Sequence, residues 1–336
     1  MNIWQEFNGS PLEWDEYIIR NEGNYRQLYE WGRLQEDKGW KVYRFLKKDN
    51  DTFHSSIQIL CKNFIFFRFL YLPGGVTGNE AGFGDLEGLI KKIVGNLPFY
   101  IRLDSNYEYD KTIVRKFLSA SWSRPVYFLN SARTLYVDLD IPEEILIDHK
   151  SRNWKKNIKK SKKFLTKIYV DTKITSTQIK SASADMQKHK NIFLRDDPAN
   201  ISNIIKFFEK DILIVYCCDE EKNILGFRSA LIKDKRAWEF YAATTKVGRS
   251  QSIGFALLDK LIKECRDQGV KKFILPLSKT NEGDTEFKKG SGGKQFKLIG
   301  EWEYSNVYFL KTLINFSLYI LYSSSTLAYI KKGLRK

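Results

Sequence analysis

Apolar and polar positions alternate in short runs along most of this chain, and the runs predict a mixed α/β protein. In residues 25–38 the apolar side chains of Tyr25, Leu28 and Tyr29 recur at helical spacing. Runs rich in aromatic and β-branched residues predict strands, which a Pro-Gly-Gly turn interrupts at residues 73–75. In the first half we expect strands at residues 41–46, 55–61, 64–71, 100–103 and 134–139, and a further helix at 85–95.

The second half repeats this order. Runs at residues 212–218, 224–232 and 238–244 predict a three-stranded meander, followed by a helix at 255–267 that Gly269 closes. A strand at 270–275, a glycine-rich turn and a final strand complete the pattern. We therefore expect two related α/β units, at residues 1–148 and 149–310, and a separate tail at 311–336.

The tail combines apolar and basic residues. Residues 307–322 are dense in aliphatic and aromatic side chains, and Lys331, Lys332, Arg335 and Lys336 follow. One interpretation is a core strand and helix. The other is a helix that lies in a membrane interface with its basic end on anionic lipid. The chain has no run of the ~20 apolar residues that a spanning helix needs.

Positive charge is in excess over the whole chain and concentrated at one place. The 336 residues include 56 Lys or Arg and 40 Asp or Glu, for a net charge of +16, which favours an anionic partner. Residues 150–167 carry nine cations and no acid, while Trp154, Ile158 and Leu165 keep helical spacing. This segment is either a solvated helix face or a surface for a pyrophosphate or an RNA backbone. Its cations are Lys150, Arg152, Lys155, Lys156, Lys159, Lys160, Lys162, Lys163 and Lys167.

Metal and nucleophile chemistry find no support in the sequence. The four cysteines lack the spacing of a metal site, and Cys217 and Cys218 are expected to pack on opposite faces of one strand. The three histidines show no partner pattern for a catalytic triad. Free thiols and a polar beginning without a signal-like apolar core favour a cytoplasmic protein, with membrane association left open.

Two short patterns suggest acyl-transfer chemistry. Gln251-x-x-Gly254-x-Ala256 falls where a loop becomes a helix, so its backbone N–H groups could bind the pyrophosphate of coenzyme A or another donor phosphate. Helix packing would explain the small residues equally well. Lys288 could stabilise an oxyanion or a donor phosphate, or be a surface lysine. The glycines that follow it, Gly290, Gly292 and Gly293, would let the backbone turn tightly beside a substrate.

The chain resembles the Fem-type aminoacyltransferases (FemABX) of peptidoglycan bridge formation, which contain two tandem acetyltransferase (GNAT)-like subdomains. The similarity spans most of the chain. It rests on Gln27-x-x-x-Trp31, Tyr71-Leu72-Pro73-Gly74-Gly75, Trp154-Lys155-Lys156-Asn157-Ile158-Lys159-Lys160, the strand from Trp238 to Ala243, and Phe287-Lys288-Lys289-Gly290-x-Gly292-Gly293 with Gly300-x-Trp302 after it. The sequence departs from the family at Ser291, where Phe is usual, at Lys155, where Arg is usual, and at Gln35, where Lys is frequent. The coiled-coil arm of some members is absent.

The resemblance implies transfer of an aminoacyl group from tRNA to an amine of a cell-wall precursor. It implies catalytic roles for Lys288 and Phe287 and an acceptor groove that includes Lys155, Asn157 and Tyr241. Arg152 and Lys289 are further candidates for substrate binding, and Gln251, Gly254 and Ala256 for the donor. No tightly bound cofactor and no metal are expected. Two alternatives remain: an acyl-CoA-dependent N-acyltransferase for an amino sugar of a surface polysaccharide, and a non-catalytic module that binds nucleic acid or membrane.

Overall fold

The computed structural model divides the chain into two compact units. The first contains residues 1–132 and 297–336, and the second contains residues 133–296. The expected boundaries at 148 and 310 are therefore wrong, because the strand at 133–138 pairs within the second unit and the last strand returns the chain to the first. The structure describes residues 3–49, 52–78, 86–162, 168–170, 173–190, 198–278 and 281–322. The expected basic residues Lys163 and Lys167 and the basic end of the tail lie outside these ranges.

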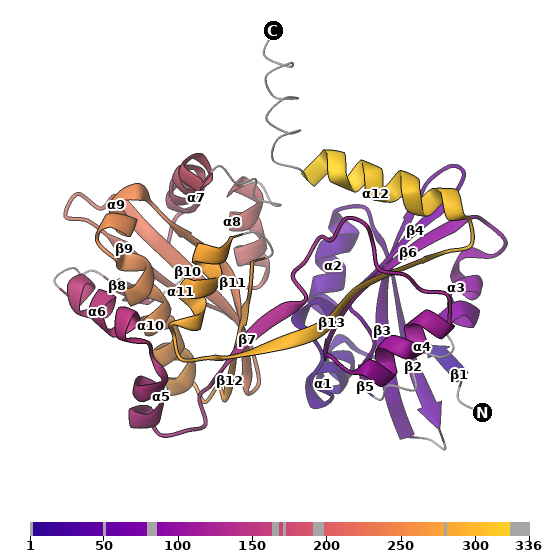
Figure 1. Ribbon diagram of the computed structural model, residues 1–336, viewed down its shortest axis with the longest axis horizontal. Coiled ribbons are helices and arrows are strands. Elements are labelled where there is room, and N and C mark those ends of the chain that lie inside the picture. Colours follow the sequence, from indigo (N-terminus) through magenta and orange to yellow (C-terminus); the bar gives the residue numbers. More distant parts are fainter. Residues whose placement is uncertain are drawn as a thin grey trace, which may run out of the picture. The chain divides into compact units, whose positions relative to one another are not determined.

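The first unit is built on a mixed sheet (Figure 1). Its strands lie in the order β1 (Ile3–Glu6), β2 (Lys41–Asp49), β3 (Thr52–Asn63), β4 (Arg68–Gly74), β6 (Phe99–Glu108) and β13 (Lys294–Ser305), and the short β5 (Thr77–Gly78) pairs with β3. Neighbouring strands are antiparallel except β4 and β6, which run parallel. The expected strand at 64–71 begins only at Arg68, since residues 64–67 form the turn between β3 and β4.

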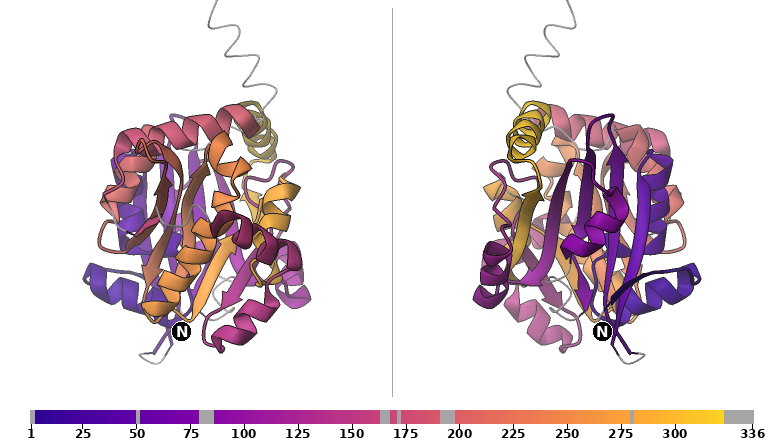
Figure 2. Two further views of the ribbon diagram at one scale, coloured as in Figure 1. Left: turned by 90° about the vertical axis from the view of Figure 1, so that its left-hand side faces the viewer. Right: turned by 90° about the vertical axis from the view of Figure 1, so that its right-hand side faces the viewer.

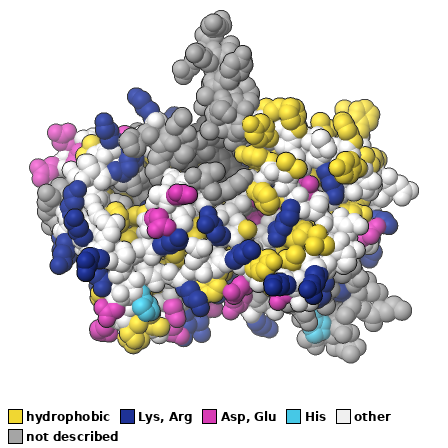
Figure 3. Space-filling view, viewed as in Figure 1, with side chains coloured by type: hydrophobic (Ala, Val, Ile, Leu, Met, Phe, Trp, Pro, Cys, Tyr) yellow, Lys and Arg dark blue, Asp and Glu magenta, His cyan; other side chains and the backbone are white. Residues whose placement is uncertain are grey.

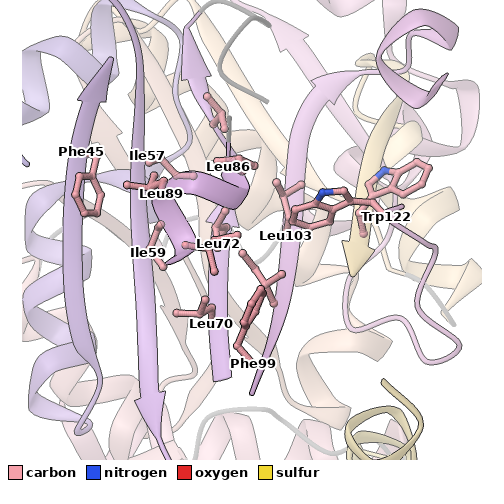
Figure 4. Close-up of a cluster of buried hydrophobic side chains, with 14 of the residues drawn as sticks. Phe45, Ile57, Ile59, Leu70, Leu72, Leu86, Leu89, Phe99, Leu103 and Trp122 are labelled. Atoms are coloured by element: carbon pink, nitrogen blue, oxygen red, sulfur yellow. The ribbon is translucent and has the colours of Figure 1, made fainter. Parts of the chain in front are cut away.

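One face of this sheet holds the apolar core of the first unit. Alternate residues of the strands, such as Ile57, Ile59, Leu70 and Leu72, pack against two helices (Figure 4). These helices are α3 (Leu86–Val94), as the sequence predicts for 85–95, and α4 (Lys111–Ser119), which it does not. Trp302 is 1% exposed in this core.

The other face of the same sheet is polar although it is buried. Arg102, Asp104, Glu301 and Glu303 are all nearly inaccessible to solvent there. The helices on this side are α1 (Pro11–Arg20), the 3₁₀ turn η1 (Tyr25–Gln27), α2 (Tyr29–Asp37) and α12 (Tyr308–Tyr322). The expected helix at 25–38 is interrupted at Leu28, whose backbone is extended.

The second unit repeats this plan with a different sheet. Its strands lie in the order β7 (Arg133–Asp138), β12 (Lys272–Pro276), β11 (Arg236–Thr244), β10 (Ile224–Lys233), β9 (Ile212–Cys218) and β8 (Ile168–Val170). The predicted meander is confirmed: β9, β10 and β11 are antiparallel neighbours. In both units the meander is followed by a helix and then by a strand parallel to its last member, β4 with β6 and β11 with β12.

Helices cover both faces of the second sheet (Figure 2). Val215 and Cys217 pack with α10 (Ile253–Asp267), and the Gln178 side chain of α7 (Ser176–Lys190) reaches Cys218 on the opposite face. Both cysteines are buried, as predicted, and neither is in a disulfide. The remaining helices are α5 (Glu143–His149), α6 (Arg152–Ser161), α8 (Pro198–Phe207), α9 (Lys246–Ser250) and α11 (Glu282–Lys289). Across the described ranges, no helix has both the length and the apolar character to cross a membrane.

Candidate active site

The candidate site is a cavity of about 740 Å³ in the second unit, formed where two parallel strands diverge. β11 and β12 pair only from Arg236 and Lys272 to Trp238 and Ile274. Beyond this point β11 continues along the cavity from Glu239 to Thr244. Other walls come from the start of α10, the loop after β12, and α11. The lining residues are Met186, Arg228, Glu239, Phe240, Tyr241, Ala242, Ala243, Thr244, Arg249, Ser252, Gly254, Phe255, Pro276, Ser278, Asn281, Gly283, Asp284, Phe287 and Lys288.

The equivalent strands of the first unit do not open in this way. β4 and β6 stay paired over seven consecutive residue pairs, from Arg68 with Phe99 to Gly74 with Ser105. A parallel pair whose backbone groups remain hydrogen-bonded leaves no space between its strands. The early divergence of β11 and β12 therefore explains why this cavity belongs to the second unit.

A buried lysine forms one wall of the cavity. The Nζ atom of Lys288 lies 2.8 Å from Glu239 Oε2 and 3.2 Å from Asp284 Oδ2, and it donates a hydrogen bond to the carbonyl oxygen of Pro276 (2.7 Å). An ammonium group has three protons, so each has an acceptor. Arg228 forms a further ion pair with Glu239. Two cations and two carboxylates thus balance at this wall.

These ion pairs set the protonation states of the wall. Burial alone would lower the pKa of Lys288, but the charges of Glu239 and Asp284 outweigh it and raise that pKa above its ordinary value. Burial would likewise raise the pKa of Glu239, and Lys288 with Arg228 lowers it instead. Lys288 is therefore an ammonium and Glu239 a carboxylate near neutral pH, so the site can supply a fixed positive charge.

Aromatic packing holds α11 in place behind this lysine. The rings of Trp154, Phe255 and Phe287 contact one another, with centroids 4.8–5.2 Å apart. The Arg228 guanidinium lies 4.8 Å from the Phe287 ring centroid. Phe287 thus lines the cavity beside Lys288 and also joins helices α6, α10 and α11.

The start of α10 reaches the cavity through a glycine that packing does not require. A Cβ atom at Gly254 would meet only Thr244 Oγ1, at an ordinary contact distance of 3.5 Å. The preceding Ser252 has a left-handed backbone (φ 61°), and its Oγ donates to Asn157 Oδ1 (2.8 Å). The open position at Gly254 leaves room for a ligand to approach the helix backbone.

The glycine-rich turn after Lys288 does not line this cavity, contrary to expectation. Gly292 has a φ of 97° and packs against His149 and Lys150, and a Cβ atom at Gly293 would clash with Leu135. These glycines connect α11 to β13 and pack against β7 and the segment before α6. The correct interpretation is structural, because backbone conformation and close packing require glycine there.

The basic helix α6 is anchored by Trp154, which is fully buried. Its described cations are mostly exposed, and Lys155 lies 3.7 Å from Asp148, itself largely exposed. Lys160 donates to the carbonyl oxygen of Ser250 (2.9 Å). This helix is amphipathic, with a buried indole and a cationic outer face.

The structure brings some of the predicted site residues together and leaves others apart. Lys288, Phe287, Tyr241 and Gly254 all line the cavity. The remaining candidates do not line it: Gln251, Ala256, Lys155, Asn157, Arg152 and Lys289. Of these, Ala256 is buried within α10, Lys289 pairs with Glu286 on the outside of α11, and Asn157 supports Ser252 at the cavity edge.

Sequence reasoning missed the partners of Lys288 and a second cation. Arg228 and Glu239 each lie within a largely apolar stretch of β10 or β11. A charged residue in such a stretch is the sequence feature that could have indicated a buried ion pair. Asp284 comes one helical turn before Lys288. Arg249 of α9 also lines the cavity, where it pairs with Asp185 (3.2 Å). Among the residues that the structure describes, no three His, Cys, Asp or Glu side chains gather as metal ligands would.

Comparison with known proteins agrees with this fold. Residues 183–289 match the Acetyltransferase (GNAT) family, so the chain carries an acyltransferase domain of this type. No curated protein sequence matches the chain. The structure of FemX is similar over 93% of this chain and 100% of its own, with a TM-score of 0.75 and 15% identity.

Two further structures are similar over most of this chain. A tandem GNAT protein from the clavulanic acid biosynthesis pathway is similar over 91% of this chain and 98% of its own, with a TM-score of 0.55 and 8% identity. L-PGS from Bacillus licheniformis is similar over 91% of this chain and 95% of its own, with a TM-score of 0.53 and 14% identity. The expectation of two GNAT-like units is thereby confirmed.

Proposed function

Because the second of two GNAT-like units is an acyltransferase domain, we propose that this protein transfers an aminoacyl group from tRNA to an amine of an anionic cell-wall precursor. The observation that carries the proposal is the buried ammonium of Lys288 at the cavity wall. A fixed cation in a site with little solvent stabilises negative charge more strongly than one in water.

The proposed reaction needs positioning and charge rather than a strong base. The neutral amine attacks the carbonyl carbon of the aminoacyl ester, and a C–N bond forms as the carbonyl oxygen becomes negative. The C–O bond to the tRNA ribose then breaks, and the proton lost by the amine ends on the ribose oxygen. The Lys288 ammonium would stabilise the oxyanion by donating to it one hydrogen bond that it otherwise donates to a protein acceptor.

Asp284 is the acceptor that such an exchange would displace. Its distance to Lys288 Nζ is 3.2 Å, compared with 2.8 Å for Glu239, and its side chain is 24% exposed, compared with 4%. Glu239 would stay in place, because Arg228 also holds it. Lys288 would thus keep one carboxylate partner while it turns to the substrate.

The cationic outer face of α6 supports a tRNA donor. Arg152, Lys156, Lys159, Lys160 and Lys162 are exposed there, and no acid occurs between Lys150 and Tyr169. Such a surface suits a polyanionic backbone, whose binding is driven by release of counterions. The resemblance to Fem-type enzymes and the similarity to FemX support the same assignment.

An acyl-CoA donor is the second candidate, with an amino sugar of a surface polysaccharide as acceptor. The open position at Gly254, at the start of α10, favours it, because a pyrophosphate could approach the helix backbone there. Arg249 at the cavity wall could pair with such a phosphate.

A donor assay separates the two candidates. The full chain is incubated with charged tRNA or with acyl-CoA, each with a nucleotide-linked peptide bearing a lysine amine and with a nucleotide-linked amino sugar. We expect transfer from charged tRNA to the peptide amine. Transfer only from acyl-CoA would replace the first proposal by the second. Product from neither donor, over both acceptors, would leave a non-catalytic binding role.

A further inference from the structure

The last described helix of the first unit has its polarity reversed. Asn315 of α12 is buried, where its amide donates to Glu303 (2.7 Å) and its carbonyl oxygen accepts from Arg102 (3.0 Å) and from the Tyr127 backbone (3.0 Å). Lys311 also faces inward and donates to Ser123 Oγ (3.1 Å). The polar sheet face of this unit thus takes the polar side of α12.

Much of the apolar surface of α12 nevertheless faces outward, although Leu310 is buried. Tyr308 and Phe309 are 83% and 67% exposed, and Leu313, Phe316, Tyr319 and Leu321 are exposed as well. A surface helix normally shows the opposite arrangement, with its apolar stripe on the core. Figure 3 shows hydrophobic side chains gathered in the region that α12 occupies in Figure 1.

A second group of exposed apolar residues lies at the end of the sheet where β4 begins. In the turn between β3 and β4, Phe64, Ile65 and Phe66 are exposed, the last two by 88% and 80%. Hydrogen bonds link the residue after this turn to the start of β6, and the start of β6 to Asn306, which precedes α12. Arg68 N donates to Pro98 O (2.9 Å), and Phe99 N donates to Asn306 Oδ1 (2.8 Å).

We propose that the apolar surface formed by residues 64–66 and the outer side of α12 binds an anionic lipid bilayer. Contiguous exposed apolar surface marks an interaction site, and aromatic side chains are enriched where a protein meets the headgroup region. The charge of the C-terminal part of the sequence matches such a partner. After Glu303 the sequence contains no Asp or Glu, and Lys331, Lys332, Arg335 and Lys336 follow α12 in the sequence.

A second copy of the chain is a poorer occupant. A symmetric dimer would place the same patch of each protomer against its partner. Such a dimer would bring together two molecules that each carry a net charge of +16. A negative bilayer attracts the same charges that oppose self-association.

Sedimentation of the full chain with vesicles tests this proposal. The wild type is expected to bind vesicles of phosphatidylcholine that contain phosphatidylglycerol, and to bind pure phosphatidylcholine vesicles much more weakly. Phe309→Ser with Phe316→Ser, and separately Ile65→Ser with Phe66→Ser, should raise the lipid concentration for half-binding by roughly tenfold or more, because each removes two apolar anchors. All four positions are exposed, so the variants should keep the wild-type melting temperature.

The matched control removes exposed apolar side chains elsewhere in the first unit. Leu12 of α1 and Leu118 of α4 are 69% and 59% exposed, and Leu12→Ser with Leu118→Ser should bind vesicles as the wild type does. The proposal is overturned if the wild type fails to bind anionic vesicles, or if patch and control variants bind alike. Patch variants that break up an oligomer without changing vesicle binding would assign the surface to a second copy instead.

Discussion

At the scale of single residues, the candidate site is a charged wall whose parts depend on one another. Lys288 is buried and remains charged because Glu239 and Asp284 pair with it, and Glu239 remains charged because Arg228 and Lys288 surround it. Removing one member of a buried pair leaves the other uncompensated, which destabilises a protein more than exchanging the whole pair. Glu239 is therefore a positioning residue for Lys288.

Glu239→Gln should lower stability and change its dependence on pH. At pH 7 we expect a loss of about 3–5 kcal/mol in the free energy of unfolding, since Arg228 and Lys288 lose their shared carboxylate. The pKa of Glu239 is lowered in the folded protein, so its contribution is present above the ordinary pKa of 4.5. It is lost as the pH falls from there through the folded-state pKa.

Urea unfolding at pH 7 and at several values below 4.5 measures both effects. The wild type should lose more stability on acidification than Glu239→Gln does. Glu286→Gln is the matched control, because Glu286 is 70% exposed in its pair with Lys289 and should cost less than about 1 kcal/mol. Parallel pH curves for the wild type and Glu239→Gln would contradict this description of the wall.

The sequence predicted part of this site and missed the rest for a physical reason. Local patterns predict Lys288 and Gly254, the resemblance to Fem-type enzymes implies Phe287 and Tyr241, and all four line one cavity. Arg228 and Glu239 belong to two different strands, and their pairing across β10 and β11 depends on strand register. A local motif carries no information on such a pair. The isolated charges in apolar stretches were the one signal available.

At the scale of elements, α6 combines a buried anchor with an exposed cationic face. Trp154 fixes the helix against Phe255 and Phe287, which leaves Lys156 and Lys159 on the outside. The spacing of apolar residues predicted this helix. Its like charges would repel one another without a polyanion, so they suit a role in binding the tRNA backbone.

Lys156→Glu with Lys159→Glu should weaken binding of charged tRNA and reduce its salt dependence. The slope of log K against log salt should fall in magnitude by roughly 2, because two phosphate contacts are lost. Lys180→Glu with Lys263→Glu makes the same change in net charge on exposed positions of α7 and α10. Fluorescence anisotropy at several salt concentrations measures both pairs. Equal slopes for the two would show that α6 takes no part in binding.

The elements with strong local patterns were predicted well. The meander of β9, β10 and β11 follows from short β-branched runs with polar turns between them, and α10 from helical spacing and the glycine after it. The aromatic run at 64–67 was predicted as strand but forms an exposed turn. The preference of aromatic residues for strands depends on what they pack against, so the local sequence alone does not determine whether this run forms a strand or a turn.

At the scale of the whole molecule, the repeated plan was predictable and its boundaries were not. Both units contain a meander, a helix and a parallel strand, as the order of runs along the sequence indicated. β7 lies next to β12 in the second unit, and residues 297–322 return to the first. In both cases the paired strands, β7 with β12 and β6 with β13, are far apart in the sequence. No short-range pattern distinguishes these pairings from simple succession along the chain.

The divergence of β11 and β12 gives the second unit its cavity, and the proposed transfer depends on Lys288 acting there. The most direct test is the single-turnover rate of transfer of a labelled amino acid from charged tRNA, measured for Lys288→Met and Lys289→Met. The two lysines are neighbours on α11, one facing the cavity and the other paired with Glu286 outside it. We predict a rate at least about tenfold lower for Lys288→Met, provided that it retains cooperative thermal unfolding, and a nearly unchanged rate for Lys289→Met. Equal rates for the two variants would contradict the account.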